Sequence, residues 1–321
     1  MHGHGREIVK YLLIGLTFVV IPFLVGHYWT RLLTSVFMFG IVAQATNLLM
    51  GFCGLVPFGN VVFFGIGAYV TAIAMGDFGV PFFAALIAAA VACAALAAII
   101  GFPILRLKGH YFAIATMGVS EAVRQLVPNL EFTGGGQGYN VPLIPLSIDA
   151  SYYFFYFLMF SIMVLATLTA YWISKNRIGY ALKAIMYNEE GARSIGINTT
   201  IYKVITWAIS AFIIGITGGV FAYWHGYVDA PGVFDLGFSV KFIIMLLLGG
   251  AGTIMGPILG AFIVELLSEI VWSQFLFLHL SILGGIIVAV VIFMPKGFLW
   301  FYRQRFSLDA LLENVRKGKV R

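Results

Sequence analysis

Long apolar segments separated by short polar connections repeat along the whole chain. A helix needs about 18 or more mainly apolar residues to cross about 30 Å of hydrocarbon, and such segments recur from end to end. They predict about ten transmembrane helices, some of them broken or re-entrant. The predicted spans are residues 9–26, 32–51, 56–75, 81–104, 110–128, 152–174, 203–224, 239–256, 257–277 and 280–296.

The composition agrees with this pattern. Of the 321 residues, 61% are hydrophobic and 10% are charged, whereas a soluble domain has about 25% charged residues. We therefore expect an all-α integral membrane protein with a single transmembrane domain over residues 1–321. The apolar run at residues 9–26 lacks a small-residue cleavage site at its end, so we interpret it as a retained first span.

The basic residues are unevenly placed along the chain. The net charge is +6, and most basic residues lie in four clusters, at Arg6 and Lys10, at Arg106 and Lys108, in residues 175–203 and in residues 296–321. The positive-inside rule places all four clusters in the cytoplasm. A chain that starts in the cytoplasm and crosses the membrane ten times, at the predicted spans, is again on the cytoplasmic side at each cluster. We therefore expect cytoplasmic N- and C-termini, a cytoplasmic loop at residues 175–202 and a basic cytoplasmic tail at residues 297–321. Attraction to anionic lipid explains this bias without a nucleic-acid partner.

The sequence lacks the usual signatures of catalysis and of metal or nucleotide binding. It contains no P-loop, no HExxH, no CxxC and no nucleophile elbow. Cys53 and Cys93 both lie in apolar segments, so they are expected to be buried thiols. We therefore expect no catalytic residue, no metal site and no cofactor in this chain, and any ATP must be handled by another subunit.

Two stretches rich in glycine interrupt the apolar pattern. Residues 51–70 contain five glycines and Pro57, and residues 249–261 contain a similar set with Pro257. Broken backbone at membrane depth is tolerated where it is buried in protein or lines a watery cavity, whereas small residues also allow helices to pack closely. The sequence leaves both explanations open.

A few polar side chains fall inside predicted spans. Gln44, Asn47 and Asn60 could line a polar passage or join helices by hydrogen bonds. Glu121 and Arg124 are three residues apart, so they share a helix face; they predict an ion pair that fixes this helix to its neighbours, or a contribution to a translocation path.

Residues 188–196 form a short polar segment with strong helix signals. Asn188 is a good N-cap, Glu189 and Glu190 follow in the first turn, and Gly196 can adopt the left-handed conformation that ends a helix. These signals predict a helix of about two turns over residues 189–195, with Ala192 and Ile195 on one apolar edge. A helix of this length is only marginally stable in isolation. We therefore expect another part of the protein or a partner to hold it in place.

This segment resembles the coupling motif of bacterial ABC importer permeases, EAAxxxG. Here the motif reads Glu190, Gly191, Ala192, three further residues and Gly196, with glycine in place of the first alanine. Further blocks extend the resemblance: "RLKGHYFAIATMGVSEAVR" (106–124), "TGGGQG" (133–138), "NRIGYALKAIMYNEEGARSIGINTTIYKVITWAISAFIIGITGGVFA" (176–222) and "LLLGGAGTIMGPILGA" (246–261). Together they are similar to the Liv-type permease family and fit its M-type subunit. Departures include Pro57 and Asn60, where the family commonly has serine and histidine.

The resemblance implies a multi-pass permease of the bacterial inner membrane with a type II-like ABC importer fold. It implies a homologous permease that completes a heterodimer, two ABC ATPase subunits and an external solute-binding protein. The solute would be a branched-chain amino acid or a related small organic molecule such as urea, an amide or a carboxylate. The residues that couple to the ATPase would be Asn188, Glu189, Glu190, Ala192, Ile195 and Gly196.

A second function class also fits an apolar chain with few charges. An ion-gradient-driven secondary transporter or a channel would need no ATPase, and Glu121 would be its candidate titratable relay. Activity without any ATPase subunit would favour this alternative. A membrane-embedded enzyme is a third and more distant alternative.

Overall fold

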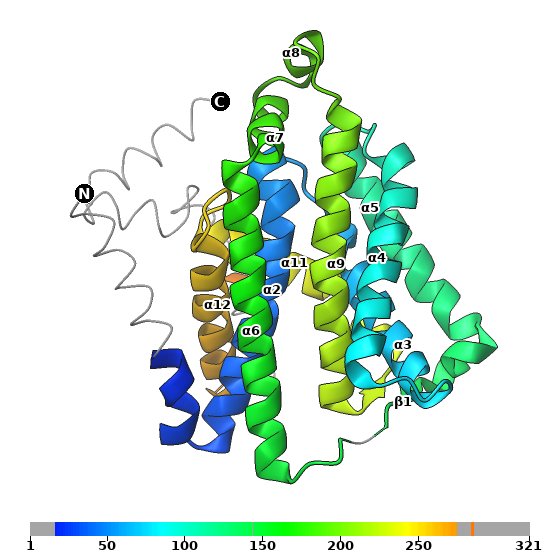
Figure 1. The fold of residues 1–321 in the computed structure, drawn as a ribbon, viewed down its shortest axis with the longest axis vertical. Helices are drawn as coiled ribbons and strands as arrows, with labels where there is room; N and C mark the ends of the chain where they lie inside the picture. Colours follow the sequence, from blue (N-terminus) through cyan, green and yellow to red (C-terminus); the bar gives the residue numbers. More distant parts are fainter. Residues whose placement is uncertain (1–16, 143, 275–283, 286–321) are drawn as a thin grey trace.

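The protein forms a bundle of long helices with a small cap at each end. The computed structural model describes residues 17–142, 144–274 and 284–285, and these residues are mainly helical (Figure 1). The elements in chain order are α2 (His27–Cys53), η1 (Phe58–Asn60), α3 (Val61–Gly76), α4 (Phe82–Ile104), α5 (His110–Leu126), η2 (Val127–Asn129), η3 (Glu131–Thr133), η4 (Gly135–Gln137), β1 (Tyr139–Asn140), α6 (Ile148–Lys175), α7 (Arg177–Tyr187), α8 (Glu189–Ser194), α9 (Thr199–His225), β2 (Tyr227–Val228), α10 (Ala230–Val233), α11 (Leu236–Gly249) and α12 (Gly256–Gln274).

Six helical segments in the described residues are long and apolar enough to cross a membrane. They are His27–Cys53, Phe58–Gly76, Phe82–Ile104, Ile148–Lys175, Thr199–His225 and Ala230–Gly249. The first five match predicted spans closely. The helices α5, of 17 residues, and α12, of 19 residues, also fall on predicted spans but are not among the six. Residues 9–16 of the predicted first span and nearly all of the last span lie outside the described residues, and residues 17–24 of the first span are helical.

The helices alternate in direction between the two ends of the bundle. In Figure 1, α7 and α8 lie at one end and β1 lies at the other. Lys108, just before α5, contacts Glu190 of α8, so the basic cluster at residues 106–108 and the one at residues 175–203 share one end. We call this the α8 end. The charge rule predicts that these clusters lie together, and the arrangement agrees.

The opposite end is closed by the connection between α5 and α6. This connection is a true loop, as its glycines and prolines indicate, and it contains short 3-10 turns and β1. Strand β1 pairs antiparallel with β2, with Tyr139 opposite Val228. The backbone N–H of Val141 donates to the carbonyl of Gly226 over 2.9 Å, and the hydroxyl of Tyr139 donates to Asp77. The loop thereby fastens the ends of α3 and α9.

The turn between α11 and α12 lies earlier than the sequence predicts. The helix α11 ends at Gly249 and α12 starts at Gly256, so the predicted boundary at residues 256–257 is wrong. Gly250 and Gly252 have φ angles of 113° and 78°, a backbone region that favours glycine and ends a helix. Hydropathy alone does not reveal this turn because Ala251, Ile254 and Met255 keep the stretch apolar.

Glycines allow several helices to pack with their backbones in close contact. A Cβ atom at Gly67 of α3 would overlap the carbonyl oxygen of Gly215 in α9, and one at Gly218 would overlap that of Phe64. A Cβ atom at Gly260 of α12 would likewise overlap the carbonyl of Met245 in α11. Of the two explanations that the sequence leaves open, close packing is the one that these glycines show.

Gly67→Ala tests this packing. The added methyl group meets backbone that cannot rotate away, so we expect the free energy of unfolding to fall by about 1–3 kcal/mol, as in other overpacked cores. The measurement is thermal or denaturant unfolding of the purified protein in detergent. Gly118→Ala is the matched control, because Gly118 is also helical but a Cβ atom added there would have no neighbouring atom within 4 Å; equal stability of the two variants would contradict the packing role.

Candidate functional site

The residues that flank the short helix α8 define both of its ends. The side-chain oxygen of Asn188 accepts a hydrogen bond from the N–H of Gly191 over 3.0 Å, which satisfies one of the free amides at a helix N-terminus. At the other end Gly196 has a φ of 87°. The helix runs from Glu189 to Ser194, so the predicted N-cap, the predicted closing glycine and the position of the helix are confirmed.

Glu189 fixes α8 to the start of α9. Its Oε1 lies 2.7 Å from Nζ of Lys203, and the two side chains are 18% and 2% exposed. The hydroxyl of Thr199 donates to the same oxygen over 3.1 Å, and Arg193 of α8 pairs with it over 2.8 Å. A buried lysine of this kind is costly unless its partner is held in place, so the pair defines where α8 sits.

The electrostatics of Glu189 agree with a paired carboxylate. Burial alone raises the pKa of Glu189, but the hydrogen bond and the charge of Lys203, the hydrogen bond of Thr199 and the charge of Arg193 together outweigh it. The net result is a pKa below the ordinary value of 4.5. Glu189 therefore stays ionised at neutral pH.

Sequence reasoning did not identify Lys203 as the partner of Glu189, although a signal was present. Thr199, Lys203, Thr206 and Ser210 repeat at helical spacing, and all four are buried in the bundle. A lysine on such a face needs an acid within reach. The nearest acids along the chain are Glu189 and Glu190.

Glu190 makes a different kind of contact. Its carboxylate lies 3.0 Å from Nζ of Lys108, in the connection between α4 and α5, and the side chains are 78% and 63% exposed. The hydrogen bond and then the charge of Lys108 lower the pKa of Glu190. Water screens an exposed ion pair, so this contact positions α8 weakly compared with the Glu189 pair.

Two apolar side chains that flank α8 are strongly exposed. Ile195 is 74% exposed and Tyr187, just before the helix, is 91% exposed. Ala192 is buried against the bundle at 2% exposure, so the predicted apolar edge shared by Ala192 and Ile195 is wrong: one faces inward and the other outward, because Ile195 follows the last helical residue. Tyr187 and Ile195 are thus exposed apolar side chains at the α8 end.

Asn47 and Asn60 join separate elements with both ends of their amides. Asn60 donates to Oγ1 of Thr46 over 3.0 Å and accepts from the indole N–H of Trp207 over 3.0 Å. Asn47 donates to the carbonyl of Thr253 and accepts from the N–H of Gly252, each over 2.8 Å. Both side chains are fully or almost fully buried, and these bonds hold α3 and the α11–α12 turn against α2.

Gln44 differs from these two residues. It is fully buried on α2, and neither its amide nitrogen nor its oxygen has a hydrogen-bond partner among the described residues. A buried amide without partners costs free energy unless a water molecule or another polar group reaches it. Of the three polar residues predicted on the spans, Gln44 is therefore the one whose side-chain hydrogen bonds are not satisfied within the described residues.

Glu121 and Arg124 form an ion pair within α5. The carboxylate lies 3.3 Å from the guanidinium, with side-chain exposures of 44% and 37%, and Gln125 also donates to Glu121 over 2.8 Å. In the described part of the chain, the pair does not connect α5 to a neighbouring helix. The same helix exposes Tyr111 and Ile114, so this side of α5 is both polar and uncovered.

Sequence reasoning also missed an acid on α12. Oε2 of Glu265 lies 2.6 Å from Nζ of Lys241 on α11, and the same Nζ lies 3.9 Å from the ring centroid of Phe39. Lys241 thus has a carboxylate and an aromatic face as partners. Both charges lie within predicted spans, where an unpaired charge is costly.

The described residues offer no metal site. They contain no group of three or more His, Cys, Asp or Glu side chains that could hold a metal ion. Cys53 and Cys93 are free and buried, as predicted.

Comparison with known proteins identifies relatives over most of the chain. Residues 28–296 match the family model described as branched-chain amino acid transport system, permease component. LivM of Salmonella typhimurium (strain LT2), a high-affinity branched-chain amino acid transport system permease protein, is 29% identical over 316 residues, covering 90% of this chain and 74% of LivM. LivM of Escherichia coli (strain K12) is also 29% identical, covering 89% and 73%.

A second kind of relative matches a shorter region. LsrC of Salmonella typhi, an autoinducer 2 import system permease protein, is 28% identical over 145 residues, or 41% of this chain and 40% of LsrC. No solved structure matches the chain.

Lys203→Met tests the attachment of α8. Removing the lysine takes away the closest cation of Glu189 while Arg193 and Thr199 remain, so we expect a loss of about 1.5–3 kcal/mol, the range for a hydrogen bond to a charged group. It is measured by unfolding and by faster amide hydrogen exchange in residues 189–196. The double variant Lys203→Met/Glu189→Gln should recover part of the loss, because it also removes the carboxylate that has lost this partner. The control Lys108→Met breaks an exposed, solvent-screened pair and should change stability little; an equal loss in both single variants would be inconsistent with a buried anchor.

The depressed pKa of Glu189 predicts a pH dependence. A carboxylate with a lowered folded-state pKa stabilises the fold fully above its unfolded value of 4.5, and this contribution disappears as the pH falls through the lower folded pKa. Hydrogen exchange in α8, corrected for intrinsic rates, should stay constant from pH 7 to pH 5 and accelerate below about pH 4. Glu189→Gln should abolish this transition. Its persistence in that variant would assign the transition to another group.

Proposed function

The chain belongs to the family of branched-chain amino acid transport system permease components, and on this basis we propose that it forms one half of the membrane path of an ATP-binding cassette importer. It is a multi-pass protein of the bacterial inner membrane, and the subunits of this family are non-catalytic permeases. In the proposed assembly, a homologous permease completes a heterodimer, two ABC ATPase subunits bind at the α8 end, and a soluble binding protein delivers the solute at the opposite end.

We propose branched-chain amino acids, or a related small organic solute such as urea, an amide or a carboxylate, as the transported molecules. The names of the two LivM relatives support the first choice. Few charged residues occur in the chain, which suits a small neutral or zwitterionic solute. The resemblance to LsrC covers less than half of either chain, so it carries less weight for the solute.

The attachment of α8 to α9 is the observation that carries the coupling role. A helix of six residues cannot transmit a displacement by itself, because a helix of this length is only marginally stable in isolation. The Glu189–Lys203 pair joins it to the base of a 27-residue helix. Movement of α8 by an ATPase would therefore move α9 with it.

The predicted coupling residues take three different roles in this proposal. Asn188 and Gly196 define the ends of α8, while Glu189 and Ala192 fasten it to the bundle. Ile195 is exposed and would enter an apolar groove of the ATPase, and Glu190 would stand at the rim of that contact. Apolar anchors surrounded by a polar rim are common at such interfaces.

We propose that the exposed side of α5 faces the second permease or the solute path. Glu121 and Arg124 are partly exposed on a helix that falls on a predicted span, and contact of such charges with lipid is costly. A protein or aqueous environment avoids this cost. Gln44 has unused hydrogen-bonding groups and remains a candidate for the path, whereas the satisfied amides of Asn47 and Asn60 favour a role in helix contacts.

The topology that we propose has ten crossings and one permease domain over residues 1–321. Both termini, the loop at residues 175–202 and the tail at residues 297–321 would be cytoplasmic. The location of two basic clusters at the α8 end supports this orientation.

Ile195→Asp tests the ATPase contact. A carboxylate cannot be buried in an apolar groove without a partner, so ATP-driven uptake by the reconstituted complex should fall at least about tenfold if the contact loses more than about 1.4 kcal/mol. Solute uptake and ATP hydrolysis are measured together in proteoliposomes. Ile195→Leu is the matched control, because it keeps an apolar side chain of the same size at the same exposed position, and its uptake should stay near that of the parent.

Two outcomes would count against the importer proposal. Full activity of this chain in liposomes without any ATPase would favour the secondary transporter or channel. Normal ATP-driven uptake by Ile195→Asp, together with normal uptake by Glu190→Gln and Gly196→Ala, would remove the coupling role from α8.

A further inference from the structure

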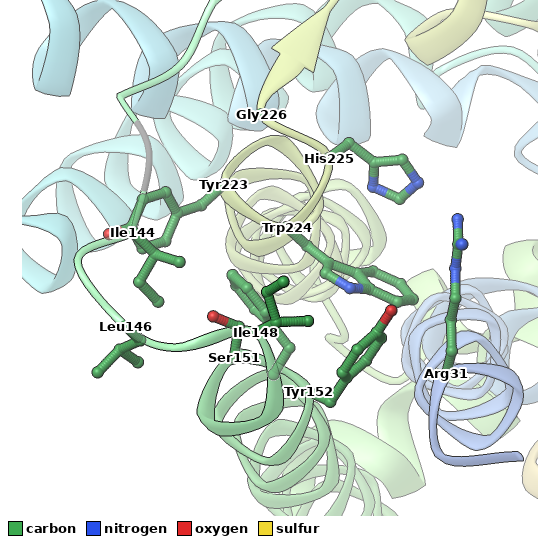
Figure 2. A pocket seen from close by; sticks show the side chains of 11 residues that line it. Arg31, Ile144, Leu146, Ile148, Ser151, Tyr152, Tyr223, Trp224, His225 and Gly226 are labelled. Atoms are coloured by element: carbon green, nitrogen blue, oxygen red, sulfur yellow. The ribbon is translucent and has the colours of Figure 1, made fainter. Parts of the chain in front are cut away.

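A cavity of about 470 Å³ opens at the end of the bundle opposite α8. It lies between the start of α2, the start of α6 and the end of α9 (Figure 2). Its volume falls in the range of about 300–1,000 Å³ that is usual for sites of small molecules. The two ATPase-coupling features described above, α8 and its anchor, lie at the other end of α9.

One side of the cavity carries the positive charge of Arg31. Figure 2 shows the side chains of Arg31 and His225 on this side. Arg31 has no ion pair or hydrogen bond with another described residue, whereas the nearby Asp149 is already paired with His27 over 3.3 Å. The guanidinium is therefore available to an anionic group, and its planar fork suits a carboxylate.

The opposite side is apolar, and aromatic rings lie between the two sides. Ile144 and Leu146 form the apolar side, and Tyr152 and Trp224 stand between them and Arg31 (Figure 2). An aliphatic group of a few carbons can be buried against the isoleucine and leucine. The faces of tyrosine and tryptophan attract cations such as an ammonium group.

We propose that this cavity binds an apolar α-amino acid, with its carboxylate on Arg31, its ammonium group over the aromatic rings and its aliphatic side chain against Ile144 and Leu146. The inference rests on the proposed function, in which this end of the molecule receives the solute. It adds an entry site in this chain and names the features of the solute that the site recognises. A free carboxylate and a short aliphatic chain are both required, and an amide in place of the carboxylate is excluded.

A phospholipid headgroup is the competing occupant, because it also offers anionic oxygens at the end of membrane helices. The test therefore uses the complex in nanodiscs of phosphatidylcholine alone, and a parallel set that contains phosphatidylglycerol. Ser151→Cys places a thiol in the wall of the cavity. The native thiols, Cys53 and Cys93, are buried, so maleimide labelling reports the new thiol.

Labelling of Ser151→Cys should slow as L-leucine is added in phosphatidylcholine nanodiscs. Isovalerate, which keeps the carboxylate and the aliphatic chain, should also protect the thiol, and L-leucinamide should not. Arg31→Gln should raise the leucine concentration for half protection by about tenfold or more, the loss expected for one charge-assisted contact. Glu131→Cys, a thiol on the loop outside the cavity, is the control and should label at the same rate with and without leucine.

Three results would overturn the inference. They are protection by leucinamide equal to that by leucine, protection unchanged by Arg31→Gln, and protection that follows phosphatidylglycerol instead of leucine, which would assign the cavity to lipid. ATP-driven uptake by the parent complex separates this inference from the proposed function. Uptake without protection of Ser151→Cys rejects the entry site alone, and protection without ATP-driven uptake rejects the importer alone.

Discussion

A polar group buried where water does not reach must find its partner inside the protein, and this constraint organises the bundle. Lys203 and Glu189 satisfy each other across α8 and α9, and Lys241 and Glu265 do so across α11 and α12. Each pair fixes one helix relative to another because neither charge can be left alone. The few charges of this chain therefore determine its architecture more strongly than their number suggests.

Two neutral side chains, Asn47 and Asn60, meet the same constraint without a charge. Asn60 joins α2, η1 and α9 by using both ends of one amide, and Asn47 holds the α11–α12 turn in the same way. Glycines such as Gly67 and Gly218 bring the backbones of α3 and α9 together. The result is a tightly packed group of helices, α2, α3, α4 and α9, beside the less covered helix α5.

The sequence predicts those features that depend on local interactions. The caps of α8 at Asn188 and Gly196 involve neighbours in the chain, so residue type and spacing suffice to predict them. The partners of Lys203 and Lys241 come from other helices, and a hydropathy profile contains no information about which helices touch. Hydropathy misplaces the turn at Gly250 for a related reason, since backbone angles and not apolar character end α11. Ala192 and Ile195 face opposite ways because α8 ends one residue before Ile195. A sequence pattern does not locate a helix end to within one residue.

The helix α9 runs from the α8 end of the molecule to the cavity at the other end as one continuous element. Its 27 residues span about 40 Å, with Lys203 near one end and Trp224 and His225 at the other. A rotation of about 5° at its base displaces the far end by about 3.5 Å. Thermodynamic linkage is reciprocal, so any free energy by which an occupant of the outer cavity favours one tilt of α9 favours the matching position of α8 by the same amount. Binding of an occupant in the cavity and binding of an ATPase at α8 would then each change the affinity of the other.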